Sequence, residues 1–187
     1  MTWSISNGIQ YLAVATCMAL LLAAAIGDLR RYRISNRLVV GVVVCFAVFA
    51  VAEASWTFIG WSLAAAGCIF ALVATLFAFG LFGGGDTKLA TAMALWIQFP
   101  DLLRFLLVMT ASGGVLGVIW MIRRRWQRQR LAASADAGAA AGADGSASQS
   151  TAVMPNKLPY GVAIAIAGAD FFLFSPNSPL AGVLTGQ

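Results

Sequence analysis

The sequence of 187 residues contains no histidine and only three cysteines, Cys17, Cys45 and Cys68. The lack of histidine excludes imidazole as a general base and as a metal ligand. The cysteines lie singly within apolar runs, without the C-x-x-C spacing of a zinc site or the pattern of a disulfide framework. We therefore expect no metal and no cofactor, and the groups left for chemistry are carboxylates, lysine and hydroxyls.

Charged residues are also scarce. They make up 10% of the chain, against about 25% in a soluble domain, while 60% of the residues are hydrophobic and the mean hydropathy is +0.85. The composition predicts an all-α polytopic membrane protein. The first charged residue is Asp28, so no basic n-region of a secretory signal precedes the first apolar run. We expect that run to be a retained helix.

The apolar runs predict about six transmembrane helices in a single membrane domain. Ser35 or Asn36 is a suitable N-cap for the second of them. A stretch rich in Ala, Gly and Ser, residues 132–156, is predicted to be a flexible low-complexity cytoplasmic loop. The predicted helices span about residues 9–26, 38–54, 58–82, 88–99, 102–122 and 158–175.

With six spans, eleven of the twelve Lys and Arg residues fall in loops on one side, and Arg104 is the exception. The positive-inside rule makes that side cytoplasmic and places both termini outside. The basic surplus is thus a topology signal and is compatible with contact to the anionic lipids of the bilayer. It requires no nucleic-acid partner.

The break between the third and fourth apolar runs contains Gly83, Gly84 and Gly85, followed by Asp86. Three glycines leave the backbone bare, so a peptide could approach the carboxylate closely. The next apolar run, from Leu89 to Phe99, is too short to cross about 30 Å of hydrocarbon. We therefore expect the glycine-rich turn to lie below the membrane surface and Asp86 to lie in a hydrated pocket.

Asp28 falls on the same predicted membrane face as Asp86, which suggests a pair. Two close carboxylates share one proton, so the ionised member can activate water while the protonated member polarises a peptide carbonyl. Which of the two is the base stays open. The alternative is that both are interfacial acids beside basic residues, that Lys88 is a snorkelling anchor rather than a residue that orients substrate, and that the glycines only pack helices. Asp170 has no role in either interpretation.

Three blocks resemble the type IV prepilin peptidases, which are GxGD-type membrane aspartyl proteases, and above all the short form that serves Tad/Flp pili. Residues 83–89, GGGDTKL, resemble the G-x-G-D-x-K-L block. Asp28, followed by Arg30 and Ile34-Ser35-Asn36, resembles the block of the first catalytic Asp, although Ser35 replaces its usual Pro. Residues 158–165, LPYGVAIA, resemble the P-Y-G-x-A-I-A stretch of the short forms.

The resemblance implies an inner-membrane hydrolase of type IV pilus and Tad secretion systems. Its active site would lie at the cytoplasmic face and cut the leader from single-span prepilin or pseudopilin precursors just before their hydrophobic segment. Asp28 and Asp86 would be catalytic, with Gly83, Gly84, Gly85, Lys88 and Asn36 in support. Larger members also methylate the new N-terminus and carry a domain with a cysteine cluster. We find no such cluster and expect cleavage without N-methylation and without zinc.

Two other functions fit the same residues. Intramembrane acids also carry protons, so a proton- or ion-coupled transporter is one alternative. It predicts weak symmetry between the two halves of the chain, and we find no internal repeat. A non-catalytic membrane subunit of the pilus assembly machinery is the other. Asn variants of both acids would still support pilus formation in that case.

Overall fold

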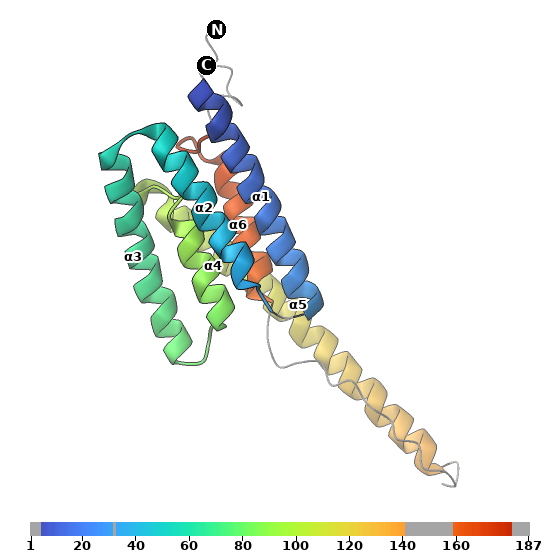
Figure 1. The fold of residues 1–187 in the computed structure, drawn as a ribbon. Helices are drawn as coiled ribbons and strands as arrows, with labels where there is room; N and C mark the ends of the chain where they lie inside the picture. The colour runs from blue at the N-terminus through green and yellow to red at the C-terminus, as the bar shows by residue number, and fades with distance from the viewer. Residues whose placement is uncertain (1–4, 32, 141–158, 181–187) are drawn as a thin grey trace.

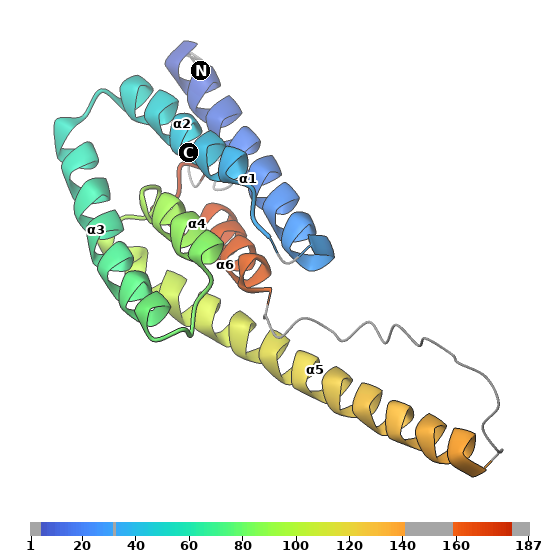
Figure 2. The same ribbon diagram turned by 60° about the horizontal axis from the view of Figure 1, so that its bottom comes forward.

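In a computed structural model, the described residues are 5–31, 33–140 and 159–180, and within them all regular structure is helical (Figure 1). This confirms the all-α prediction. Successive helices run in alternating directions, and α5 projects well beyond the bundle formed by the others (Figure 2). The helices are α1 (Ile5–Arg31), α2 (Asn36–Glu53), α3 (Trp56–Ala78), α4 (Gly84–Ala94), α5 (Phe99–Ala140) and α6 (Tyr160–Phe174).

Four of these helices are long and apolar enough to cross a membrane, and they support the expected membrane protein. α6 is a shorter apolar helix, and α4 has only eleven residues. Six spans and the orientation of the termini therefore stay predictions. The four long segments are Asn7–Arg31, Asn36–Glu53, Trp56–Ala78 and Phe99–Arg130.

Several helix boundaries differ from the predicted ones. α1 continues to Arg31, so Asp28 lies inside a helix rather than after its end. α5 continues through the arginine run to Ala140, so the predicted loop at 132–156 begins as helix, and its residues 141–156 lie outside the described residues. Alanine and arginine are strong helix formers, so an existing helix continues through them. The N-cap of α2 is confirmed as Ser35, whose side chain accepts a hydrogen bond from the Arg37 N–H.

α4 is the central helix of the bundle and packs against α2, α3 and α6. Its length agrees with the predicted 88–99 helix, but it begins four residues earlier, at Gly84. The depth of the turn before it, residues 79–83, stays a prediction, and a second irregular segment follows α4 in residues 95–98. There Trp96 is 2% exposed and packs its ring against Phe46, Phe49 and Phe172, with ring centroids 5.4 to 5.8 Å apart. This aromatic cluster covers the turn between α4 and α5.

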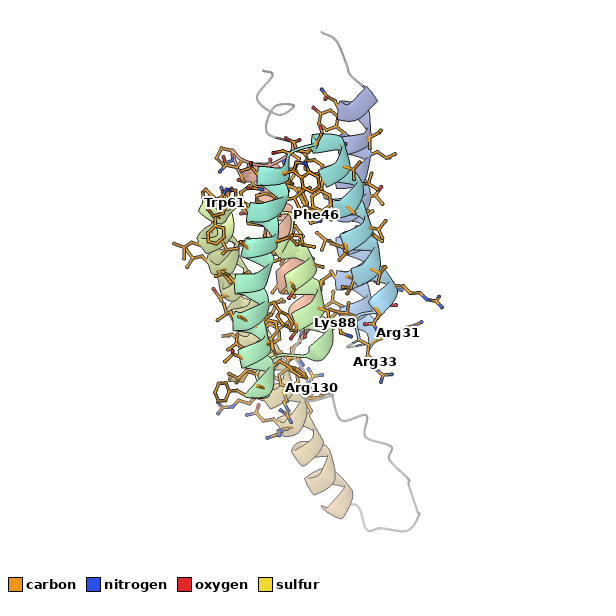
Figure 3. The ribbon with its side chains drawn as sticks, turned by 60° about the vertical axis from the view of Figure 1, so that its left-hand side comes forward. Arg31, Arg33, Phe46, Trp61, Lys88 and Arg130 are labelled. Atoms are coloured by element: carbon orange, nitrogen blue, oxygen red, sulfur yellow. The ribbon has the colours of Figure 1, made fainter. Side chains whose placement is uncertain are left out.

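The charged residue Asp170, for which the sequence indicated no role, has an ion-pair partner at the end of the bundle near Trp96. Arg104 on α5 forms a two-pronged ion pair with Asp170 on α6, with Nε–Oδ2 and Nη2–Oδ1 distances of 3.0 and 3.2 Å. Arg104 also donates to the Phe174 carbonyl, near the C-terminus of α6. The single Arg predicted on the opposite side from the other basic residues therefore joins the last two helices. Figure 3 shows Arg31, Arg33 and Lys88 toward the other end of the bundle.

Candidate active site

The last turn of α1 and the first turn of α6 meet at Asp28. Its side chain is 4% exposed, and its Oδ2 accepts a hydrogen bond of 2.8 Å from the backbone N–H of Gly161. This N–H belongs to the first turn of α6, where backbone N–H groups have no partner within the helix. Gly161 also permits the close approach, because a β-carbon there would lie 2.9 Å from Asp28 Oδ2.

Asp86 lies in the first turn of α4, three residues after the N-cap residue Gly83. A carboxylate at this position interacts favourably with the positive end of the helix dipole. The carboxylate folds back over Gly83, where a β-carbon would lie 2.5 Å from Asp86 Oδ2. Asp86 is 8% exposed. A side chain at Gly83 would therefore force this carboxylate to move.

The connection between α1 and α2 holds the two sites together through Ile34. A β-carbon on Gly85 of α4 would lie 3.3 Å from the Ile34 Cβ, and one on Gly161 of α6 would lie 2.9 Å from its Cδ1. Ile34 is thus wedged between the first turns of α4 and α6. Those two turns carry Asp86 and the N–H that binds Asp28, so Ile34 contacts the supports of both carboxylates.

Both carboxylates line one cavity of about 660 Å³. Its wall combines the end of α1, the start of α2, the turn between α3 and α4, and the start of α6. All seven residues that the sequence predicts for the site lie on this wall: Asp28, Asn36, Gly83, Gly84, Gly85, Asp86 and Lys88.

Lys88 bridges two elements at the edge of the cavity. Its Nζ donates a hydrogen bond of 3.3 Å to Oδ1 of Asn36, the first residue of α2. Both side chains are exposed. This contact places a positive charge on the cavity wall near the negative groups. The role of Lys88, as an orienting residue or as a snorkelling anchor, stays a prediction.

The sequence indicated no role for the aromatic side of the cavity. The rings of Phe82 and Tyr160 stack with centroids 4.8 Å apart, and both residues line the cavity. Tyr160 also packs against Gly113 of α5, where a β-carbon would lie 3.3 Å from the Tyr160 ring. The P-Y-G block contained Tyr160 and Gly161, but only the packing of α6 against α1 and α5 reveals what they contact.

No group of three or more His, Cys, Asp or Glu side chains that could hold a metal ion occurs in the described ranges. Cys17, Cys45 and Cys68 are free thiols. The site offers two buried carboxylates, an ammonium group and bare backbone around a cavity large enough for an extended peptide segment and water. Such a site suits hydrolysis of a peptide bond by a pair of acids.

The fold and the cavity thus define a helical protein, with four helices long and apolar enough to cross a membrane, in which two buried carboxylates line one cavity. Residues 15–121, more than half of the chain and including both acids, match the type IV leader peptidase family, and the chain belongs to this family. It is a prepilin leader peptidase, an aspartic protease of the inner membrane. Neither the curated proteins nor the solved structures provide a significant match.

Membership of the family decides between the functions considered from the sequence. It supports a peptidase and gives no support to the transporter or the non-catalytic pilus subunit. The matched range ends within α5 and leaves out α6. The hydrogen bond from Gly161 to Asp28 therefore lies beyond the part that identifies the family.

Proposed function

We propose that the protein cleaves Tad/Flp-type prepilins at the cytoplasmic membrane face, with Asp28 and Asp86 as the catalytic pair. The observation that carries this proposal is the single cavity that both carboxylates line. Residues 58 positions apart in the chain reach the same cavity from α1 and α4. A purely interfacial pair of acids would have no reason to be buried at 4% and 8% exposure around a shared space.

In the proposed reaction, the ionised carboxylate takes a proton from a water molecule, whose oxygen attacks the carbonyl carbon of the scissile peptide bond. The protonated carboxyl group donates a hydrogen bond to the carbonyl oxygen and stabilises the developing negative charge. Collapse of the tetrahedral intermediate breaks the C–N bond, and the leaving amine takes up a proton. The reaction leaves one proton on the pair, ready for another cycle.

The glycines and Lys88 have supporting roles in this proposal. A helical peptide hides its carbonyl groups in hydrogen bonds, so the substrate must be extended at the cut. Gly83, Gly84 and Gly85 expose the backbone of α4 to the cavity and leave room for such a segment. Lys88, held by Asn36, adds a positive charge that orients the substrate carbonyl or an acidic leader residue.

The short Tad/Flp form and the absence of N-methylation are proposed on sequence grounds. Residues 158–165 carry the block that resembles the short forms. The sequence has three cysteines and no C-x-x-C pair, unlike the cysteine cluster that the larger members carry. The cytoplasmic position of the site is supported by Arg31, Arg33 and Lys88, which lie toward the same end of the bundle (Figure 3).

The test is co-expression of a Tad-type prepilin with the wild type, with Asp28→Asn and with Asp86→Asn, followed by a gel-shift assay of leader removal. Cleavage by the wild type and loss of cleavage in both variants is the expected result. Mass spectrometry of the mature pilin should show an unmethylated N-terminus. Normal processing by either Asn variant would overturn the proposed pair, and a methylated product would overturn the proposed single activity.

A further inference from the structure

A second concave surface begins where the Asp28 site ends. It is an apolar groove of about 530 Å³ between α1 and α6, and its wall is almost entirely apolar. On α1 it extends from Met18 to Leu29, about 16 Å along the helix at 1.5 Å per residue. On α6 it extends from Val162 to Ala169. We call this surface the α1–α6 groove.

No residue lines both the α1–α6 groove and the cavity of the proposed catalytic site, but the two linings are adjacent in the chain. Leu29 follows Asp28 in the chain, and Val162 follows Gly161, whose N–H binds Asp28. One end of the groove is therefore formed by the immediate neighbours of that hydrogen-bonded pair. From there, the groove runs along α1 away from the basic end of the bundle, in the direction of the membrane interior.

The shape of the groove suits a helix rather than an extended peptide. Its floor includes small residues, Ala25, Ala165 and Ala169, while Leu22 and Ile26 rise at its side, 62% and 42% exposed. In a bilayer, helices associate through close packing over small residues, because lipid tails are as apolar as the side chains. A third helix can therefore approach α1 and α6 closely here.

We infer that the α1–α6 groove binds the hydrophobic helix of the prepilin substrate and sets the position of the cut. This inference rests on the proposed function. A prepilin is cut just before its hydrophobic segment, so the peptide bond must lie at the catalytic acids while the segment continues into the membrane. A helix seated in the groove, with its first turn at Leu29 and Val162, satisfies both conditions.

A second apolar groove provides the matched control. It has a volume of about 430 Å³ and is lined by Ile9 of α1 and by residues of α2 including Val48 and Ala52. It involves the first turns of α1 and the last turns of α2, so it lies at the other end of the bundle from Asp28. Ile26 in the α1–α6 groove and Val48 in the control groove are similarly exposed, at 42% and 45%.

The decisive experiment places a photo-crosslinking amino acid at Ile26 or at Val48 in the full chain. Each is combined with Asp86→Asn to hold uncut prepilin, and the pair is co-expressed with a Tad-type prepilin in membranes. The expected result is a crosslink from position 26 to the hydrophobic segment of the prepilin and none from position 48. Equal crosslinking at both positions, or products at position 26 with lipid or a second copy of the chain alone, would overturn the inference.

A kinetic test checks the same contact without relying on a crosslink. Ala165→Leu narrows the α1–α6 groove, and Ala52→Leu makes the same change in the control groove. We expect Ala165→Leu to raise KM for full-length prepilin about tenfold with little change in kcat. Ala52→Leu should match the wild type. A short peptide substrate that lacks the hydrophobic segment should be cut equally by all three.

The proposed function and the groove fail in different ways. If the wild type cleaves prepilin but Ala165→Leu behaves as Ala52→Leu does, and position 26 gives no prepilin crosslink, the groove is wrong and the peptidase stands. If the wild type does not cleave any Tad-type prepilin, the proposed substrate fails and the groove inference fails with it.

Discussion

Asp28 and Asp170 are both carboxylates within apolar helices that pack together, but the two ends of the bundle treat them differently. Asp170 meets the guanidinium group of Arg104 in a two-pronged ion pair, next to the aromatic cluster around Trp96. Asp28 accepts a hydrogen bond from the backbone N–H of Gly161 and faces a cavity that Asp86 also lines. The carboxylate of Asp170 is neutralised by its partner, whereas the cavity leaves Asp28 open to substrate.

The residues around each acid follow the same division. Near Asp170, large side chains fill the space, and the turn between α4 and α5 is covered by Trp96. Near Asp28 and Asp86, glycines at the start of α4 line the cavity, and Gly161 in the first turn of α6 leaves room for the Asp28 carboxylate. The end of the bundle around Asp170 is thus filled with side chains, whereas the end around Asp28 and Asp86 is less densely packed and has space for a substrate. The predictions below test this division, beginning with the largest expected effect.

The largest effect is expected from the acids themselves. Asp28→Asn and Asp86→Asn should each reduce prepilin cleavage by about 1,000-fold or more, because each removes a proton donor or acceptor from the proposed pair, and 1,000-fold corresponds to about 4 kcal/mol of transition-state stabilisation. The matched control is Asp170→Asn, which should cleave within about threefold of the wild type. Initial rates with purified enzyme and prepilin in detergent provide the measurement. A comparable loss in Asp170→Asn would break the division.

The glycines that touch the carboxylates come next. Gly161→Ala and Gly83→Ala bring a β-carbon to 2.9 and 2.5 Å from Oδ2 of Asp28 and Asp86, so each carboxylate must move. We expect kcat to fall about 10- to 100-fold, because a displacement of about 1 Å in a catalytic group has this effect. Gly60→Ala in α3 is the control, because no heavy atom lies within 4 Å of its added β-carbon. Wild-type rates in Gly161→Ala would show that the hydrogen bond from its N–H does not position Asp28.

The Arg104–Asp170 pair should affect stability and leave catalysis unchanged. A double-mutant cycle of Arg104→Met and Asp170→Asn is expected to give a coupling free energy of about 1 kcal/mol, in the range of measured ion pairs and interhelical hydrogen bonds. Thermal unfolding in detergent measures this coupling, and Arg104→Met should lower Tm by a few degrees. The cleavage rate of folded Arg104→Met at low temperature should equal that of the wild type. Slower cleavage by folded Arg104→Met would show that the ion pair affects the catalytic end of the bundle.

The smallest effect is expected at the rim of the cavity. Lys88→Gln and Asn36→Ala each remove the exposed hydrogen bond between Lys88 and Asn36. We expect each variant to cleave prepilin about two- to fivefold more slowly than the wild type. If the bond acts only by holding Lys88, the double variant should be no slower than Lys88→Gln alone. Strictly additive losses would show that Asn36 has a separate role, and the same cleavage assay distinguishes the two results.

Much of the site could be predicted because the sequence contains few side chains that can catalyse a reaction. With no histidine and seven acids in an apolar chain, the carboxylates at the break before Asp86 and at the end of the first apolar run were prominent. Their burial around one cavity agrees with that prediction, and their catalytic role stays a proposal. Gly161, Ile34 and Tyr160 were not assigned a role, because a backbone donor, an aliphatic wedge and an aromatic wall carry no charge signal in a hydrophobic sequence.

The errors had one cause. The ends of apolar runs were taken as the ends of helices, but helices continue through polar residues when their backbone hydrogen bonds remain satisfied. α1 therefore includes Asp28, α5 includes the arginine run, and α4 begins at Gly84 rather than near Lys88. The shortness of α4 was predicted correctly, and irregular backbone precedes it as expected, but the second irregular segment at Trp96 was not foreseen.

The linear sequence determined that this protein is helical and membrane-embedded, because apolar runs of this length bury their backbone polar groups only as helices. It also restricted the available chemistry to carboxylates, lysine and hydroxyls, because histidine is absent. Only the tertiary structure decided which acid pairs with Arg104 and which two share a cavity, since these contacts join residues from distant helices. Asp28 lies against Gly161 and Asp86 lies against Gly83, and a β-carbon on either glycine would clash with that carboxylate.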